Sequence, residues 1–181
     1  MKIKLLFEGE SDRLALTALL HEDFNAAEPY AEFVKADYGG RRRGFTRILA
    51  REIAIAIEVD KADAVWIHID LETDTAEKMQ ENLGKILSRV PEAYRFRVKF
   101  FVIHRNLESV LIAGCFEKER NYSLLENTKG KVRRVLRRFF HQFYIETIHA
   151  PQYAAKADKE KIIRRIGGIR QLQQALTNLL L

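Results

Sequence analysis

Strand-like and helix-like patterns alternate along the first hundred residues, and this alternation constrains the fold more than any other feature of the chain. Each short apolar run is followed by a longer segment whose apolar residues recur near a 3.6-residue spacing. The expected strands are residues 2–7, 32–37, 64–70 and 96–104. The expected helices between them are residues 13–22, 44–59 and 75–89. The alternation predicts an α/β fold with a mainly parallel four-stranded sheet, flanked by helices.

After residue 104 the pattern changes to successive helices, expected at residues 107–119, 131–149, 157–166 and 169–180, with breaks at Pro151 and at Gly167-Gly168. With 181 residues, the chain can bury a real core. We expect an α/β core over residues 1–115 and a basic helical extension over 116–181 packed on it, together forming one globular unit. The single cysteine, Cys115, excludes an internal disulfide and a zinc site built from cysteines.

Acidic residues stand where two of the expected strands end. Glu8 follows the apolar run of the first strand, and Asp70, Glu72 and Asp74 follow the third. If these two strands are neighbours, their carboxyl ends border one crevice, where oxygen ligands could hold a hard divalent cation. Alternatively, the acids cap helix N-termini, where negative charge is favourable. At the first strand, however, Ser11 or Asp12 could cap the helix instead of Glu8.

This arrangement of acids resembles the Toprim domains of topoisomerases, DnaG-type primases, recombination proteins and the overcoming-lysogenization-defect nucleases. A Toprim domain has a glutamate and a glycine after its first strand, which Glu8-Gly9 match. It also has an Asp-x-Asp motif after its third strand, where Asp70-Leu71-Glu72 stands with Glu as the second acid. The segment FFVIHRNLESVLIAG, in which Glu108 opens an apolar helix, and the tail from Tyr153 through QLQQAL are similar to small stand-alone Toprim-like proteins of unassigned function.

The resemblance implies a site for Mg²⁺ or Mn²⁺ that acts on nucleic acid. Asp70 and Glu72 would hold the cations, Asp74 is a further ligand candidate, and Glu8 would bind metal or act as general base. His68 shares a strand face with Asp70 and either supports that carboxylate or is a core residue. The leading prediction is a Toprim-type nuclease that hydrolyses phosphodiesters. The alternatives are a non-catalytic nucleic-acid-binding or protein-interaction module and, less favoured, a primase-type nucleotidyl transferase.

Charge is segregated along the chain. Residues 1–90 hold 13 Lys and Arg against 17 Asp and Glu, a net −4, whereas residues 91–181 hold 18 against 8, a net +10. Two arginine clusters could contact phosphates. They are Arg41, Arg42 and Arg43 in a glycine-flanked loop, and Arg133, Arg134, Arg137 and Arg138 on an expected helix. Each cluster could equally be a solvated surface, and an acidic protein or an anionic membrane would also meet a basic face.

The sequence offers no sign of a membrane or secretory segment. No apolar run approaches the roughly 20 residues of a membrane span, and the N-terminus goes directly into a strand pattern. We therefore expect a cytoplasmic protein with DNA or RNA as partner and no membrane partner. A homodimer or a partner protein stays possible.

Overall fold

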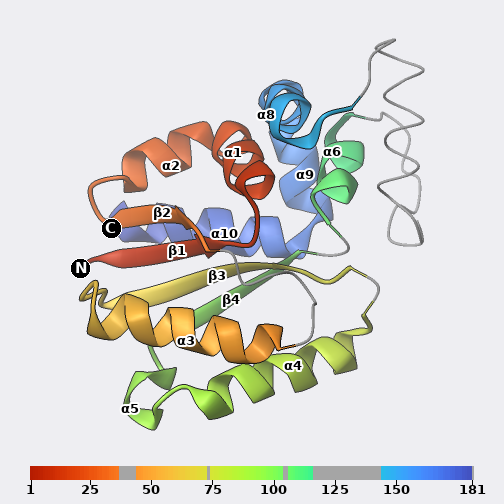
Figure 1. The fold of residues 1–181 in the computed structure, drawn as a ribbon. Helices are drawn as coiled ribbons and strands as arrows, with labels where there is room; N and C mark the ends of the chain where they lie inside the picture. The colour runs from red at the N-terminus through yellow and green to blue at the C-terminus, as the bar shows by residue number, and fades with distance from the viewer. Residues whose placement is uncertain (37–43, 73, 104–105, 116–143, 181) are drawn as a thin grey trace.

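The computed structural model describes residues 1–36, 44–72, 74–103, 106–115 and 144–180. Its centre is a four-stranded, all-parallel sheet with the strand order β2-β1-β3-β4 (Figure 1). The strands are β1 (Ile3–Phe7), β2 (Ala31–Lys35), β3 (Ala64–Asp70) and β4 (Val98–Ile103). The predicted α/β class and the parallel sheet are confirmed. The fourth strand starts two residues later than expected, because a short helix occupies the chain just before it.

Helices connect the strands and complete the chain. They are α1 (Glu10–Leu19), α2 (His21–Ala27), α3 (Phe45–Glu58), α4 (Ala76–Arg89), α5 (Glu92–Arg95), α6 (Leu107–Cys115), α8 (Glu146–Lys156), α9 (Lys159–Arg165) and α10 (Gly167–Thr177), followed by the 3₁₀ turn η2 (Asn178–Leu180). No helix in the described part of the chain is long and apolar enough to cross a membrane.

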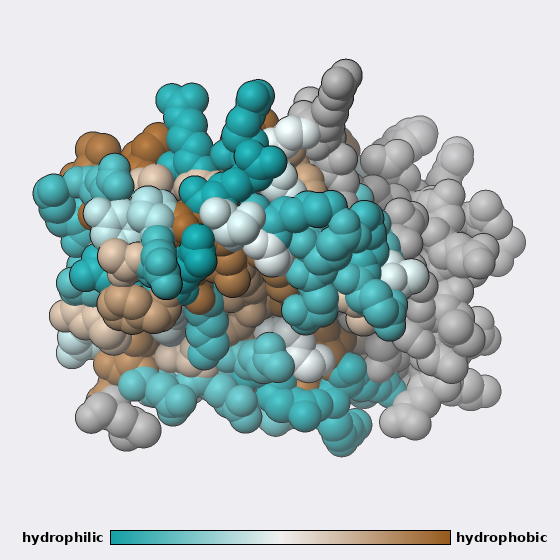
Figure 2. All heavy atoms as spheres, turned by 90° about the horizontal axis from the view of Figure 1, so that it is seen from below, coloured by the Kyte–Doolittle hydropathy of each residue, from teal (hydrophilic) through white to brown (hydrophobic). Residues whose placement is uncertain are grey.

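The helices form a layer on each face of the sheet. Figure 1 shows α3 and α4 on one face, and α1, α2, α8 and α10 on the other. Successive strand side chains point to opposite faces of the sheet and belong to two hydrophobic clusters. Leu5 lies in the cluster on the α1 face, and Leu6 lies in the cluster on the α3 face. Figure 2 shows many hydrophilic residues on the outer surface of the α3 and α4 face, with hydrophobic residues visible between them. Burial on both faces explains why the strands read as nearly continuous apolar runs.

The C-terminal helices belong to the same core as the first strand. Ile162 of α9 and Ile169 and Leu172 of α10 are fully buried in one cluster with Ile3 of β1. Gly168 is essential to this packing, because a Cβ there would lie 2.1 Å from the carbonyl oxygen of Val102 in β4. The start of α10 therefore lies directly against the backbone near the carboxyl end of β4.

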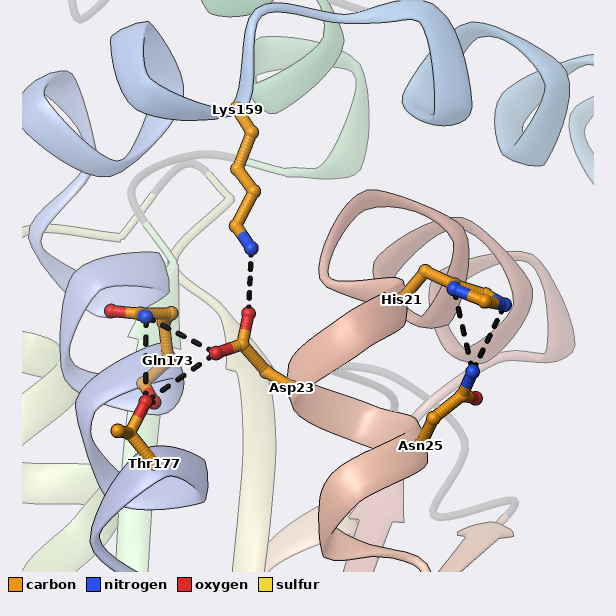
Figure 3. A network of polar contacts seen from close by, with 6 residues as sticks. All are labelled: His21, Asp23, Asn25, Lys159, Gln173 and Thr177. Carbon is orange, nitrogen blue, oxygen red and sulfur yellow. Dashed lines mark hydrogen bonds and ion pairs between the residues drawn. The ribbon is translucent and has the colours of Figure 1, made fainter.

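A polar network also ties the C-terminal helices to α2 (Figure 3). One carboxylate oxygen of Asp23 accepts a hydrogen bond from Lys159 Nζ at 2.8 Å. Its other oxygen accepts from Gln173 Nε2 at 3.2 Å and from Thr177 Oγ1 at 3.4 Å. One carboxylate on α2 thus joins α9 and α10.

Two expected helix boundaries were wrong. The segment predicted as one helix over residues 13–22 is two helices, because Leu20 leaves helical geometry with φ −107° and ψ 37°. Pro151 does not break the chain but lies inside α8. Ala150, Tyr153 and Ala154 around it are buried in the core, and this packing outweighs the backbone hydrogen bond that proline cannot make.

Candidate functional site

The sheet order brings the two acidic strand ends together. β1 pairs in parallel with β3, with Leu6 opposite Ile67. Glu8 directly follows β1 and Asp70 is the last residue of β3, so both lie at the carboxyl edge of neighbouring strands. The expectation that the third strand lies beside the first is confirmed.

Asp70 is the centre of a group of carboxylates that we call the acid cluster: Glu8, Asp12, Asp70, Glu72 and Glu108. The Asp70 side chain is only 14% exposed. Burial raises its pKa well above the usual value of 3.8, and the negative charges of Asp12, Glu8, Glu108 and Glu72 raise it further. Four other carboxylates therefore act on one buried carboxylate.

The members of the acid cluster come from three connections at this edge of the sheet. Asp12 is in the first turn of α1 and Glu108 in the first turn of α6, and their exposed fractions are only 8% and 1%. Glu8 is half-buried in the turn from β1 to α1. Glu72 follows β3 with φ 49°, in the left-handed region that few side chains adopt.

Gly9 makes room for the acid cluster. A Cβ at this position would lie 2.9 Å from Asp12 Oδ2, closer than a Cβ contact normally comes. The Glu8-Gly9 pair thus combines an acid at the strand end with space for a second acid one helical turn later. Any larger residue at position 9 would displace the Asp12 carboxylate.

Other residues occupy or serve the N-cap positions of the helices that follow the strand ends. The N-cap residue of α1 is Gly9, which has no side chain to cap the helix, whereas Glu8 precedes the N-cap position. The N-cap of α4 is Thr75, whose Oγ1 accepts from Lys78 N at 3.2 Å. At α6, Asn106 Oδ1 accepts from Ser109 N at 3.1 Å and so serves the first turn of that helix.

Asp74 is not a member of the acid cluster and interacts with α4 instead. Its Oδ2 accepts a hydrogen bond from Asn82 Nδ2 of α4 at 3.2 Å. Its charge is not among those that shift the pKa of Asp70. Of the three acids in the HIDLETD segment, the structure therefore places Asp70 and Glu72 together and directs Asp74 toward α4.

His68 lies beneath the acid cluster. Its Nε2 is 3.9 Å from Asp70 Oδ1, and its ring centroid is 5.6 Å from that of Phe7. Burial lowers the pKa of His68 to about 3, so the imidazole is neutral at physiological pH. The histidine is thus a core residue that also neighbours the Asp70 carboxylate.

The acid cluster has the right donor chemistry for a hard cation, but it is not arranged as a finished metal site. Carboxylate oxygens are the ligands that Mg²⁺ and Mn²⁺ prefer. Among the residues that the structure describes, no three His, Cys, Asp or Glu side chains are grouped closely enough to hold a metal ion. The carboxylates would have to rotate toward a common centre to bind one.

The sequence named four of the five members of the acid cluster and missed Asp12 as a member. The sequence feature that could have identified Asp12 is its four-residue spacing from Glu8, which places it one turn into the helix that starts at the strand end. The two expected arginine clusters, at residues 41–43 and 133–138, lie outside the described residues.

The comparisons with known proteins add no relative: no protein-family model, no curated protein and no solved structure matches this chain.

Proposed function

We propose that this protein hydrolyses phosphodiester bonds of nucleic acid with the help of Mg²⁺ or Mn²⁺ bound at the acid cluster. The observation that carries the proposal is the environment of Asp70, a buried carboxylate whose pKa is raised by four other carboxylates. Purely structural carboxylates are seldom gathered in this way, because like charges in a poorly solvated place repel one another. Perturbed groups of this kind are typical of functional sites.

A divalent cation would relieve this repulsion. Asp70, Glu8 and Glu72 are the residues that would hold it, with Asp12 and Glu108 completing the negative environment. The cation would polarise the phosphoryl oxygen and lower the pKa of a bound water, which is the chemistry that metal ions supply in phosphodiester hydrolysis. The match of Glu8-Gly9 and Asp70-Leu71-Glu72 to Toprim motifs supports the same assignment.

Burial divides the roles among the acids. Glu8 is half-buried and so remains accessible to water, which suits it to accept the proton of the attacking water. Asp70 and Glu108 are shielded from solvent and would carry negative charge at the floor of the site when a cation is bound. His68, neutral and within 3.9 Å of Asp70, limits the positions that this carboxylate can take.

A non-catalytic nucleic-acid-binding or protein-interaction module is the second candidate. It is favoured by the absence of a ready grouping of three metal ligands among the described residues. In that case the acid cluster would have no catalytic role. The protein would bind its partner equally well with and without divalent cations.

Cleavage assays distinguish the two candidates. Purified protein is incubated with single- and double-stranded DNA and RNA in Mg²⁺ or Mn²⁺. We expect Glu8→Gln and Asp70→Asn to lower the cleavage rate by about a hundredfold or more, because each change keeps the shape and removes a charge or base. Glu81→Gln, an exposed change on α4, is the matched control and should retain activity.

Two outcomes would overturn the proposal. Wild-type protein that binds nucleic acid but cleaves none of these substrates with either metal would favour the binding module. Cleavage that survives in both variants would assign the activity to another site.

A further inference from the structure

We infer that Lys35 and Arg47 form a phosphate-contacting rim on the β2 side of the acid cluster and guide the nucleic-acid backbone toward it. This inference rests on the proposed function and adds which residues hold the substrate and from which side it approaches. Neither residue belongs to the arginine clusters expected from the sequence.

The sheet register places Lys35 beside the acid cluster. Lys35 is the last residue of β2 and lies opposite Phe7, the last residue of β1. Adjacent strands are about 5 Å apart, so the end of β2 is one strand spacing from the point where Glu8 leaves β1. Lys35 is exposed at this position.

Electrostatics independently place Lys35 near the start of α1. The pKa of Glu10 is lowered chiefly by its hydrogen bond to Arg13, and the positive charge of Lys35 contributes to the same shift. Lys35 is therefore close enough to act on the helix that carries Asp12.

Arg47 occupies the neighbouring helix start on the other face of the sheet. It is the third residue of α3, and its backbone N–H donates to Gly44 O at 3.0 Å in the first turn. In Figure 1, α3 begins on the side where the strands end and runs back toward the side where they start. Its first turn thus lies on the side of the carboxyl edge, and the Arg47 side chain is exposed there.

Among the residues that the structure describes, Lys35 and Arg47 are not held by a carboxylate, in contrast to two nearby or comparable cations. Arg13 is held by Glu10 through Nε at 3.0 Å and Nη2 at 2.5 Å. Lys159 is held by Asp23. Within the described part of the chain, neither Lys35 nor Arg47 forms an ion pair within 4.0 Å. Their charge is available for an external anion.

A polyanion needs such groups at this place. The acid cluster repels every phosphate except the one that the bound cation neutralises, so neighbouring phosphates require positive charge close by. Lysine supplies a point charge, and the planar fork of arginine matches two phosphate oxygens. Lys35 and Arg47, on the two faces of the same sheet edge, could contact successive phosphates on the β2 side.

The experiment measures binding apart from cleavage. Oligonucleotides of single- and double-stranded DNA are titrated with Asp70→Asn protein, in which we expect cleavage to be slow, over a series of salt concentrations. Lys35→Gln, Arg47→Gln and the double change are introduced into this parent. Arg51→Gln is the matched control, because Arg51 is exposed on the same helix one turn farther from the edge.

We expect the logarithmic slope of affinity against salt to shrink by nearly one unit for each rim residue removed, and by nearly two in the double variant, with no dependence on base sequence. Arg51→Gln should leave the slope unchanged. A double variant with the slope and affinity of its parent would overturn the inference while leaving the proposed function standing. A parent that binds no nucleic acid would overturn the inference, and a wild type that also binds none would overturn the proposed function as well. Binding through the rim without cleavage by wild type would overturn only the nuclease.

Discussion

His68 Nε2 lies 3.9 Å from Asp70 Oδ1, and both side chains are withdrawn from water. Burial moves the two pKa values in opposite directions, lowering that of His68 to about 3 and raising that of Asp70. Both shifts favour the uncharged form. A bound cation would favour the charged form of Asp70, so this carboxylate is central to the cation-binding role that we propose.

The buried histidine predicts a specific loss of stability in acid. Unfolded His68 has a pKa near 6.5 and takes up a proton as the pH falls below that value, whereas the folded form resists protonation until about pH 3. The free energy of unfolding should therefore fall from pH 6.5 toward pH 3, by at most about 1.4 kcal/mol per pH unit for one proton. Asp70 acts in the opposite sense, because its raised pKa adds stability at low pH that is lost as the pH rises.

Urea unfolding between pH 7 and pH 4 measures this effect once Asp70 is removed. The Asp70→Asn protein should show the full contribution of His68, and the His68→Gln, Asp70→Asn double variant should show a flatter profile. All other titrating groups are shared, so the difference isolates His68. Parallel profiles for the two proteins would contradict the assignment.

Replacing Gly168 by alanine should loosen α10 from the sheet. The added Cβ would meet Val102 O at 2.1 Å, and this backbone atom cannot move aside cheaply. We expect a loss of about 1–3 kcal/mol in the free energy of unfolding, measured by urea denaturation. The adjacent Gly167→Ala is the control, since nothing lies within 4 Å of its Cβ, and it should be neutral or slightly stabilising. Equal effects of the two substitutions would refute the close packing of α10 on β4.

The Asp23 network should contribute measurably to the attachment of the C-terminal helices. Asp23→Ala removes the partner of Lys159, Gln173 and Thr177 together. We expect a cost of about 1–3 kcal/mol, because three donors lose a shared acceptor. His21→Ala on the same helix is the control, since the contact of that ring is with Asn25 alone among the interactions drawn in Figure 3. A double-mutant cycle with Lys159→Met would give no coupling if the ion pair is only a surface contact.

The parts of the site carried by strands could be predicted from the sequence. The end of β3 was placed correctly, and the meeting of Glu8 with Asp70 follows from the rule that parallel strands end at one edge. The burial of Asp12 and Glu108 could not be predicted, because it depends on how α1 and α6 pack. Asp74 was a further ligand candidate in the sequence, but it accepts a hydrogen bond from Asn82 of α4.

Local sequence rules also failed where packing overrides them. Leu20 separates α1 from α2 without a glycine or proline to signal the break. Pro151 carries such a signal, yet the helix continues through it because the residues around it are buried. In both cases the tertiary environment, which a linear pattern does not contain, decides the local structure.

Binding of Mn²⁺ tests the central claim most directly. Calorimetric titration of wild-type protein with MnCl₂, paired with thermal unfolding, should show cation binding and a melting temperature that rises with Mn²⁺ concentration, because the ion relieves the repulsion around Asp70. Asp70→Asn should lose both responses, and Glu81→Gln on the exposed face of α4 should keep them. A wild-type protein that neither binds Mn²⁺ nor melts at a higher temperature at millimolar concentrations would contradict the account.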